Sequence, residues 1–197
     1  MSDNGAVAGP DGKLRCPWGL NPPEYIAYHD EEWGRPLHGD TAIFERLCLE
    51  GFQSGLSWLT ILRKREAFRV AFAGFDPERV ARFDEADVRR LLADTGIVRN
   101  RAKVEAAIAN ARATLDLPGG LGRLLWSFAP DPATRPRPVT FADVPPTSPE
   151  STAMAKDLRK RGFRFVGPTT AYALMQSCGL VDDHLVECWR AAPVSVR

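Results

Sequence analysis

Four residues of types that commonly bind metal ions lie at opposite ends of this 197-residue chain. Cys16 and His29 lie near the start, and His184 and Cys188 lie near the end. The later pair is four residues apart, a spacing that puts both side chains on one face of a helix, so we expect a helix there. Two cysteines and two histidines make a closed tetrahedral set of the kind that structural zinc prefers. One shared ion would tie the two ends of the chain together and leave no open position for a substrate.

The same residues also allow a plainer interpretation, because scattered cysteines and histidines occur without any metal. Cys48 and Cys178 fall in apolar helical stretches and are typical of core residues. Residues 1–13 are polar and glycine-rich, with no hydrophobic run that would act as a secretory signal. We therefore expect free thiols in a cytoplasmic protein rather than a disulfide framework.

The overall charge and hydropathy restrict the possible partners. The formal net charge is +1, so no global field attracts the chain to nucleic acid, and any polyanion must bind at a local cluster. Arg159, Lys160 and Arg161 form one such cluster with Arg164, although a solvated helix end would look the same. No apolar stretch approaches the roughly 20 residues that a membrane span needs, so we expect no membrane contact.

Helical patterns dominate and few stretches alternate with period two, so we predict an all-α fold. We predict helices capped by Asp40, Asp84 and Ser148, a helix opened by Asp76-Pro77, and helices over residues 56–73, 101–115 and 169–178, with a break at 51–55. We also predict a disordered extension over residues 1–13, a single domain over 14–190 and a tail over 191–197. Residues 129–149 contain seven prolines and should form an extended connector.

Residues 153–178 predict two helices joined by a short turn. A turn that ends in Gly167 would expose the backbone N–H groups around Thr169 at a helix N-terminus, which favours anions. Arg161 and Arg164 flank this turn. Such a hairpin can bind a run of DNA phosphates without reading bases, although any pair of helices joined by a turn looks similar.

The order of several longer motifs is more specific. These motifs are RCPW (15–18), YIAYHDEEWG (25–34), FERLCLEGFQSGLSW (44–58), KRGFRFVG (160–167), MQSCGLVDDH (175–184) and the final Cys188. Over about residues 14–190 the chain resembles the constitutive DNA-3-methyladenine glycosylase I family, within the helix-hairpin-helix superfamily of DNA glycosylases. The resemblance implies the helix-hairpin-helix glycosylase fold, with one structural zinc held by Cys16, His29, His184 and Cys188 and tying the N- and C-terminal segments together.

The resemblance also implies an activity. Members of this family are expected to flip 3-methyladenine out of double-stranded DNA and excise it by hydrolysis, leaving an abasic site in base excision repair. The alkylated base is cationic and is attracted to the faces of electron-rich rings. The family's pocket carries over as the aromatic residues Tyr25, Tyr28 and Trp58 and the acidic Glu50, which would hydrogen-bond the adenine edge. We expect the protein to act as a monomer on DNA that contains an alkylated purine.

The segment from Gln53 to Leu56 is the best candidate for entering the minor groove and filling the gap left by the flipped base. Gln53 could help to read the base or its orphaned partner, and Gly55 and Leu56 would contact the DNA. The alternative for each aromatic candidate is a place in the core, as is common for isolated Tyr and Trp in helical proteins.

Two positions bear on the mechanism. Bifunctional members of the superfamily carry a nucleophilic lysine just after the hairpin glycine, where this chain has Pro168, so we expect no lyase activity. Asp182 occupies the position of a catalytic aspartate in many superfamily members, although the resembled family is described as lacking it. Asp182 could instead cap a helix just before a metal ligand, and Asp183 could support that ligand.

Two other functions remain open from the sequence. The chain could be a non-catalytic, zinc-stabilised module that binds DNA, although phosphate binding alone needs no carboxylate among aromatic residues. It could also be an enzyme of the same scaffold that acts on another lesion, such as 3-methylguanine, because Phe52 stands where the family can carry a polar residue.

Overall fold

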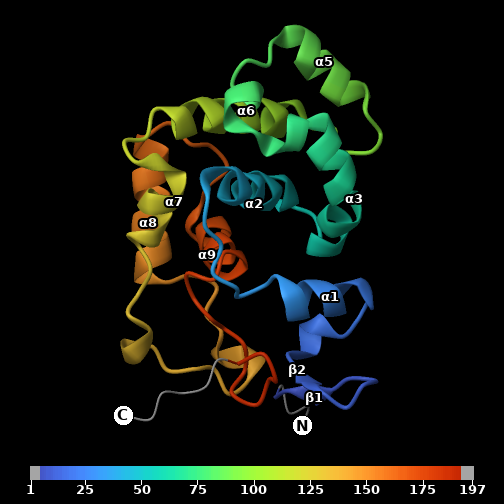
Figure 1. Ribbon diagram of the computed structural model, residues 1–197, viewed down its shortest axis with the longest axis vertical. Helices are drawn as coiled ribbons and strands as arrows, with labels where there is room; N and C mark the ends of the chain where they lie inside the picture. The colour runs from blue at the N-terminus through green and yellow to red at the C-terminus, as the bar shows by residue number, and fades with distance from the viewer. Residues whose placement is uncertain (1–4, 192–197) are drawn as a thin grey trace. The chain divides into compact units, whose positions relative to one another are not determined.

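The structure, a computed structural model, describes residues 5–191 and is mostly helical, which confirms the predicted all-α character (Figure 1). The α-helices are α1 (Glu24–Glu31), α2 (Asp40–Gln53), α3 (Trp58–Ala71), α4 (Pro77–Val80), α5 (Glu85–Ala93), α6 (Arg101–Leu115), α7 (Gly120–Trp126), α8 (Pro149–Lys160) and α9 (Pro168–Ser177). One short hairpin joins β1 (Val7–Ala8) and β2 (Leu14–Arg15). Within residues 5–191, no helix is both long and apolar enough to span a bilayer.

The chain divides into two compact units, each assembled from segments that are distant in sequence. Among the described residues, the first unit contains 5–36, 129–146 and 175–191, and the second contains 37–128 and 147–174. The single domain predicted over residues 14–190 therefore comprises parts of both units. Both ends of the described chain belong to the first unit.

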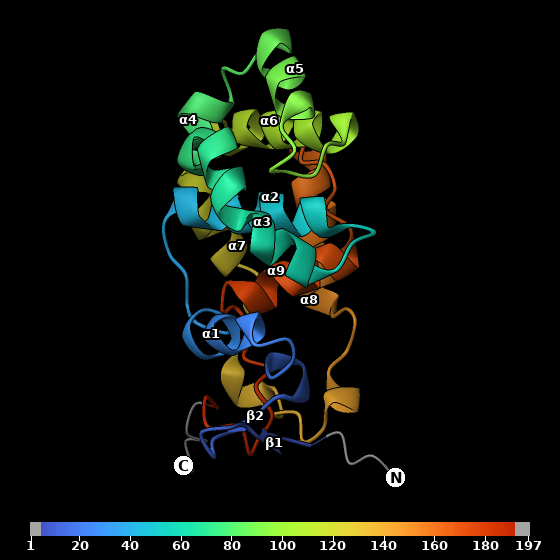
Figure 2. The same cartoon turned by 90° about the vertical axis from the view of Figure 1, so that its right-hand side faces the viewer.

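The first unit contains α1, the β1–β2 hairpin and the proline-rich connector. β1 and β2 are antiparallel, with Val7 opposite Arg15, and the C-terminal segment lies beside them where the Trp189 N–H donates to the Leu14 carbonyl at 2.9 Å (Figure 2). The predicted disorder is thus wrong for residues 5–13, because Gly12 supplies a left-handed turn and Arg15 binds Asp11 across it. Residues 1–4 and most of the predicted tail over 191–197 lie outside the described residues.

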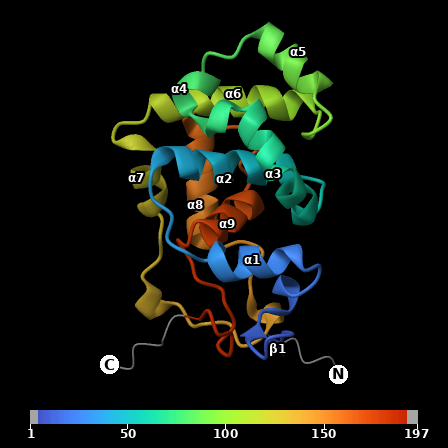
Figure 3. The same ribbon diagram turned by 45° about the vertical axis from the view of Figure 1, so that its right-hand side comes forward.

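The second unit is a helical bundle built on aromatic side chains. Helices α2 and α6 lie side by side (Figure 3), and α3 also packs against α2. Phe52, Phe68 and Phe72 are fully buried and make ring contacts with one another at centroid distances of 4.6–6.1 Å. This core fixes the C-terminal end of α2, which carries Glu50.

Most of the predicted helix starts are confirmed. Asp76 caps α4, Asp84 caps α5 and Ser148 caps α8, the last two with reciprocal capping boxes. The prediction that Asp40 caps α2 is wrong. Asp40 is the first residue of that helix, and its carboxylate accepts the Gly122 N–H of α7 at 2.8 Å. An anion near the first turn of α7 stabilises that glycine-rich helix start.

The break predicted at residues 51–55 begins later than expected, since α2 runs through Gln53. Gly51 remains helical, and a Cβ there would come within 3.5 Å of the Phe165 Cβ, so the glycine admits a close neighbour. Helices α1 and α7 are not predicted by the sequence patterns, because α1 has no clear apolar periodicity and α7 is only seven residues long and begins at glycines. The proline-rich connector contains two short 3-10 turns, at Pro132–Thr134 and Phe141–Asp143, and its last predicted residue, Pro149, is the first residue of α8.

Candidate active site and metal centre

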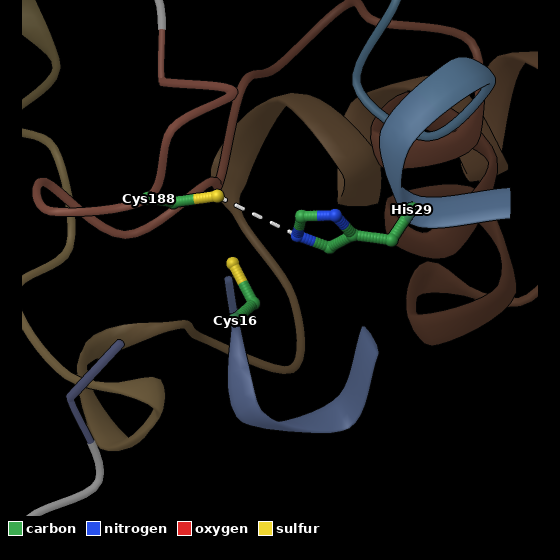
Figure 4. A group of neighbouring side chains, drawn as sticks. All are labelled: Cys16, His29 and Cys188. Carbon is green, nitrogen blue, oxygen red and sulfur yellow. Dashed lines mark hydrogen bonds between the residues drawn. The ribbon is translucent and has the colours of Figure 1, made fainter. Parts of the chain in front are cut away.

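Three of the four predicted metal ligands converge in the first unit (Figure 4). Cys16 directly follows β2, His29 lies on α1 and Cys188 lies in a C-terminal turn, and all three are buried. Their ligand atoms lie within 4.8 Å of one another, and His29 Nε2 is 3.5 Å from Cys188 Sγ. Ligands of one tetrahedral zinc ion are separated by roughly 3.5–4 Å, given Zn–S bonds of about 2.3 Å. The group can therefore hold a metal ion.

His184 lies beside this group without belonging to it. Its ring centroid is 4.9 Å from that of His29, and its buried Nε2 has no hydrogen-bond partner among the described residues. Such an orphaned nitrogen fits a ligand position. The predicted helix over His184 and Cys188 is wrong: residues 184–188 form a turn in which the Cys188 N–H donates to the Leu185 carbonyl at 2.8 Å. The four-residue spacing is met by a turn as well as by a helix.

Both histidines are oriented in the same way. His29 Nδ1 is 2.8 Å from Asp30 Oδ1, and His184 Nδ1 is 2.8 Å from Asp182 Oδ1. An ionised carboxylate only accepts hydrogen bonds, so each ring donates from Nδ1, and Nε2 is the nitrogen left to face a metal ion. Histidine ligands of metals are commonly oriented by such carboxylates.

An arginine in turn fixes each carboxylate. Arg15, itself buried, donates through Nη2 to Asp30 Oδ2 at 2.7 Å. Arg137, from the proline-rich connector, binds Asp182 Oδ2 at 2.9 Å and also donates to the His184 carbonyl at 3.2 Å. Neither arginine was predicted from the sequence. Arg15 directly precedes the candidate ligand Cys16, and this neighbourhood could have pointed to it. Arg137 is far in sequence from every candidate ligand.

The two cysteine sulfurs influence each other. A hydrogen bond from Cys16, with a further contribution from His29, lowers the pKa of Cys188. The same pairing, together with burial, raises the pKa of Cys16. A stable thiolate is the form that binds zinc. Cys48 and Cys178 are buried and lie outside this group, as predicted for core residues.

Two of the predicted pocket residues lie next to the metal group, on α1. Tyr25 and Tyr28 contact the ring of Trp18 at centroid distances of 5.9 and 6.3 Å. Trp18 also lies against His29, at 5.3 Å. Tyr28 is buried and Tyr25 is half-buried. Helix α1, which carries both tyrosines, therefore also supplies His29 to the metal group.

The other predicted pocket residues belong to the second unit. Glu50 lies in the last turn of α2 and is only 5% exposed, which is unusual for a carboxylate. Trp58 is the first residue of α3, and Gln53 is the last residue of α2. The structure thus places Tyr25 and Tyr28 in one unit and Glu50, Gln53 and Trp58 in the other.

Between α2 and α3, residues 53–56 form a tight turn. Ser54 has φ −45° and ψ 117°, Gly55 has φ 79°, and the Leu56 N–H donates to the Gln53 carbonyl at 2.7 Å. These values define a type II turn, which requires glycine at its third position. Leu56 is 42% exposed at the end of this turn. The turn therefore presents an apolar side chain to solvent.

The predicted hairpin consists of α8, a turn and α9. Gly162 ends α8 with φ 92°, its N–H donates to the Arg159 carbonyl, and the Phe163 N–H donates to the Leu158 carbonyl, which together form a Schellman motif. The Gly167 carbonyl accepts the Ala171 N–H at 2.8 Å, and α9 begins at the next residue, Pro168. A Cβ at Gly167 would meet no atom of the described chain within 4 Å, and its φ is ordinary. The fold itself therefore does not require glycine there.

The predicted DNA-contacting side chains of the hairpin are exposed. Arg161 is bound to Asp157 at 2.7 Å, within the last turns of α8. Arg164 and Thr169 are also exposed, while Phe163 and Val166 anchor the turn in the core. Lys103 and Asn110 bind the backbone of the two turns, and their partners are about 50 residues away in sequence.

The comparisons with known proteins agree on one family. The sequence model of the methyladenine glycosylase family matches residues 18–191. DNA-3-methyladenine glycosylase 1 of Escherichia coli (strain K12) is 47% identical over 177 residues, which cover 88% of this chain and 95% of that protein. The chain belongs to the methyladenine glycosylase family. The predicted family and the prediction that this protein is a glycosylase enzyme are both confirmed.

Solved structures of relatives share the fold of this glycosylase. A crystal structure of a 3-methyladenine DNA glycosylase I matches with a TM-score of 0.83 at 47% identity, over 89% of this chain and 98% of the other. A structure concerned with 3-methyladenine recognition by the Staphylococcus aureus enzyme also matches with a TM-score of 0.83, at 36% identity and over 91% and 97% of the two chains.

Proposed function

We propose that this glycosylase acts as a monomer on double-stranded DNA, flips out 3-methyladenine and excises it by hydrolysis, leaving an abasic site. The observation that carries the proposal is the buried carboxylate of Glu50, in a chain whose relatives are named for 3-methyladenine. A charge interaction is stronger at a buried carboxylate than at a solvated one, because the local dielectric is lower. A base alkylated at N3 is cationic, whereas normal adenine is neutral. Glu50 would therefore favour the lesion.

The aromatic candidates would support this selectivity. Tyr25, Tyr28 and Trp58 supply electron-rich rings, to whose faces a cationic base is attracted. The charged base is also already a good leaving group, so strong protonation by a general acid is not needed. In this account the enzyme contributes chiefly recognition and the energy of base flipping. The turn 53–56, with its exposed Leu56, would occupy the gap in the duplex.

The positions directly after the hairpin glycine carry no lysine that could act as the nucleophile of a lyase reaction. Pro168, Thr169 and Thr170 follow Gly167. Among the lysines near the proposed DNA-binding turns, Lys103 is buried and donates to two backbone carbonyls. We therefore propose a monofunctional enzyme, because a Schiff base needs an accessible, unprotonated amine.

We further propose that Cys16, His29, His184 and Cys188 hold one structural zinc. The donor set is that of closed zinc sites, and the orphaned Nε2 of His184 fits the fourth position. A bound zinc would supply folding energy rather than a reactive group, since no coordination position stays open. Asp182 would then orient His184, and its two carboxylate oxygens, bound to His184 and Arg137, favour this role over a catalytic one.

Hairpin binding to phosphates completes the proposal. The N-terminus of α9 presents backbone N–H groups beside a glycine that the fold does not require. Glycine at such a position permits close approach of another backbone. Arg161 and Arg164 would add charge to this contact, and none of these groups reads a base.

The experiment is a base-release assay on duplexes that carry 3-methyladenine, 3-methylguanine or 7-methylguanine. We expect rapid release of 3-methyladenine and strand cleavage only after alkali treatment. Release of another base in preference would assign the scaffold to a different lesion. Binding of DNA without release of any base would leave a binding module, and cleavage without alkali would contradict the monofunctional proposal.

A further inference from the structure

Helix α6 carries two buried polar side chains, Lys103 and Asn110, that bind backbone outside the helix, whereas the buried Thr114 donates to the Asn110 carbonyl within it. Lys103 is 8% exposed and Asn110 is 3% exposed, and the seven residues between them correspond to about two helical turns. Their inward neighbours Val104, Ala107 and Ala111 are apolar. Burial of an ammonium or an amide is costly unless its hydrogen bonds are satisfied. The partners of these two side chains are therefore informative.

Lys103 binds the turn between α2 and α3. Its Nζ donates to the Phe52 carbonyl at 2.8 Å and to the Ser54 carbonyl at 2.5 Å. The peptide after Ser54 is the central peptide of the type II turn, and its orientation distinguishes a type II turn from a type I turn. The ammonium also lies at the C-terminus of α2, where a positive charge is favourable. Lys103 therefore fixes both the end of α2 and the geometry of the turn 53–56.

Asn110 binds the hairpin turn in the same way. Its Oδ1 accepts the Arg164 N–H at 2.7 Å, and its Nδ2 donates to the Arg164 carbonyl at 3.1 Å. Both backbone groups of Arg164 are thereby satisfied, although the side chain of Arg164 is exposed. The next residue, Phe165, has φ 55°, in the left-handed region that non-glycine residues seldom adopt. Asn110 thus holds a strained turn by its backbone.

The C-terminal end of α2 and the hairpin turn meet over the face of α6 that carries Lys103 and Asn110. A small cavity of about 10 Å³ is lined by Lys103, Asn110, Gly51 and Phe165, among other residues. A Cβ at Gly51 would lie 3.5 Å from the Phe165 Cβ, so α2 and the hairpin turn are in close contact there. A single rigid helix therefore sets the spacing between the turn 53–56 and the hairpin turn.

We propose that Lys103 and Asn110 are positioning residues that hold the groove-entering turn and the phosphate-binding hairpin at a fixed spacing on one duplex. This inference rests on the proposed function. Preorganisation of two contacts lowers the entropic cost of making both at once. The two residues act on different steps. Asn110 supports a contact made to any duplex, whereas Lys103 supports a turn that acts only once the base leaves the stack.

The test separates affinity from rate on folded protein. For Lys103→Met we expect the single-turnover rate at saturating protein to fall roughly 10- to 100-fold, with affinity for undamaged duplex within about twofold of wild type. For Asn110→Leu we expect the reverse, an affinity lowered roughly tenfold and a saturated rate within about threefold. Lys103→Arg, which keeps donors for both carbonyls, should recover most of the rate.

The chain offers a matched control. Lys64 also donates to two backbone carbonyls, those of Thr95 and Gly96 at 2.9 and 3.2 Å, in the same unit but away from both turns. Lys64→Met should leave both parameters unchanged. If Lys103→Met does not fold, Gly55→Ala strains the same type II turn directly and should reproduce the loss of rate.

The inference would be overturned if both variants lost affinity and rate in parallel, or if neither variant changed. In either case, release of 3-methyladenine by the wild-type protein would still support the proposed function. Wild-type protein that binds duplex but releases no 3-methyladenine would overturn both. A purely structural role would lower both parameters together, in proportion to the folded fraction, and would not give opposite changes for two residues of one helix.

Discussion

His29 and His184, the two histidines of the candidate metal centre, share one hydrogen-bonding scheme. Burial acts to raise the pKa of Asp182, but its hydrogen bonds with His184 and the charge of Arg137 lower that pKa to about 2. The pKa of Asp30 is likewise lowered to about 2 despite burial, through Arg15 and His29. Both carboxylates are therefore ionised under ordinary conditions and hold their histidines with Nε2 available. This scheme gives Asp182 a role that needs no contact with DNA.

Asp182→Asn tests that role. We expect affinity for zinc to fall roughly 10- to 100-fold, because the neutral amide orients His184 more weakly and does not raise its basicity. Competition with a chromophoric chelator measures this affinity. Protein loaded with excess zinc should still release 3-methyladenine within about threefold of the wild-type rate.

Asp143→Asn is a suitable control, since Asp143 lies on the same connector and caps a short 3-10 turn. Unchanged zinc affinity in Asp182→Asn together with lost excision would instead make Asp182 a catalytic residue.

At the scale of elements, the hairpin contains two glycines with different roles. Gly162 has φ 92° and ends α8, so Gly162→Ala should destabilise the fold by about 1–2 kcal/mol. Gly167 has an ordinary φ and open space around its missing Cβ, so Gly167→Ala should leave thermal stability almost unchanged. If a phosphate approaches Gly167, the added methyl group should weaken binding of damaged and undamaged duplex equally. Wild-type affinity in folded Gly167→Ala would place the phosphate contact elsewhere.

The hairpin arginines should differ in their contribution to DNA binding. Arg164→Glu should weaken binding regardless of lesion and reduce the slope of log affinity against log salt by about 1, as expected for one lost phosphate contact. Arg161→Glu should have a smaller effect, because Arg161 is already bound to Asp157. Titrations at several salt concentrations measure both slopes, and equal slopes for Arg164→Glu and wild type would contradict the placement.

Elements with local signals were predictable from the sequence, whereas elements fixed by distant partners were not. The bounds of α6 follow from its periodicity and from Asn100, which caps it at residue 101. The start of α7 depends on Asp40, which is about 80 residues away, so no local pattern predicts it. The candidate metal ligands were predictable as residue types, but the turn over 184–188 was not, because a four-residue spacing does not specify a helix.

At the scale of the whole molecule, the metal group joins segments from both ends of the described chain within one unit. Cys188→Ala should lose the zinc and reduce stability by more than the roughly 1 kcal/mol of a typical point mutation. Metal analysis and thermal melting measure the two effects. Cys48→Ala, which removes a buried cysteine outside the group, should keep the metal. A zinc-free Cys188→Ala protein with wild-type stability would contradict a structural role for the ion.

The central claim is that the Glu50 carboxylate selects a cationic base. Glu50→Gln keeps the size and hydrogen-bonding capacity of the side chain but removes its charge. Glu45→Gln is the matched control, because it neutralises another carboxylate on the same helix α2, one that forms an ion pair with Arg69. Binding of undamaged duplex should be the same in both variants, since the proposed phosphate contacts lie on the hairpin.

Single-turnover release of 3-methyladenine from duplex DNA by folded Glu50→Gln protein tests this claim most directly. We expect the rate to fall by one to two orders of magnitude, corresponding to about 1.5–3 kcal/mol for a hydrogen bond to a charged group, while Glu45→Gln stays near wild type. A Glu50→Gln rate equal to that of wild type would contradict the account, because the carboxylate would then play no part in selecting the base.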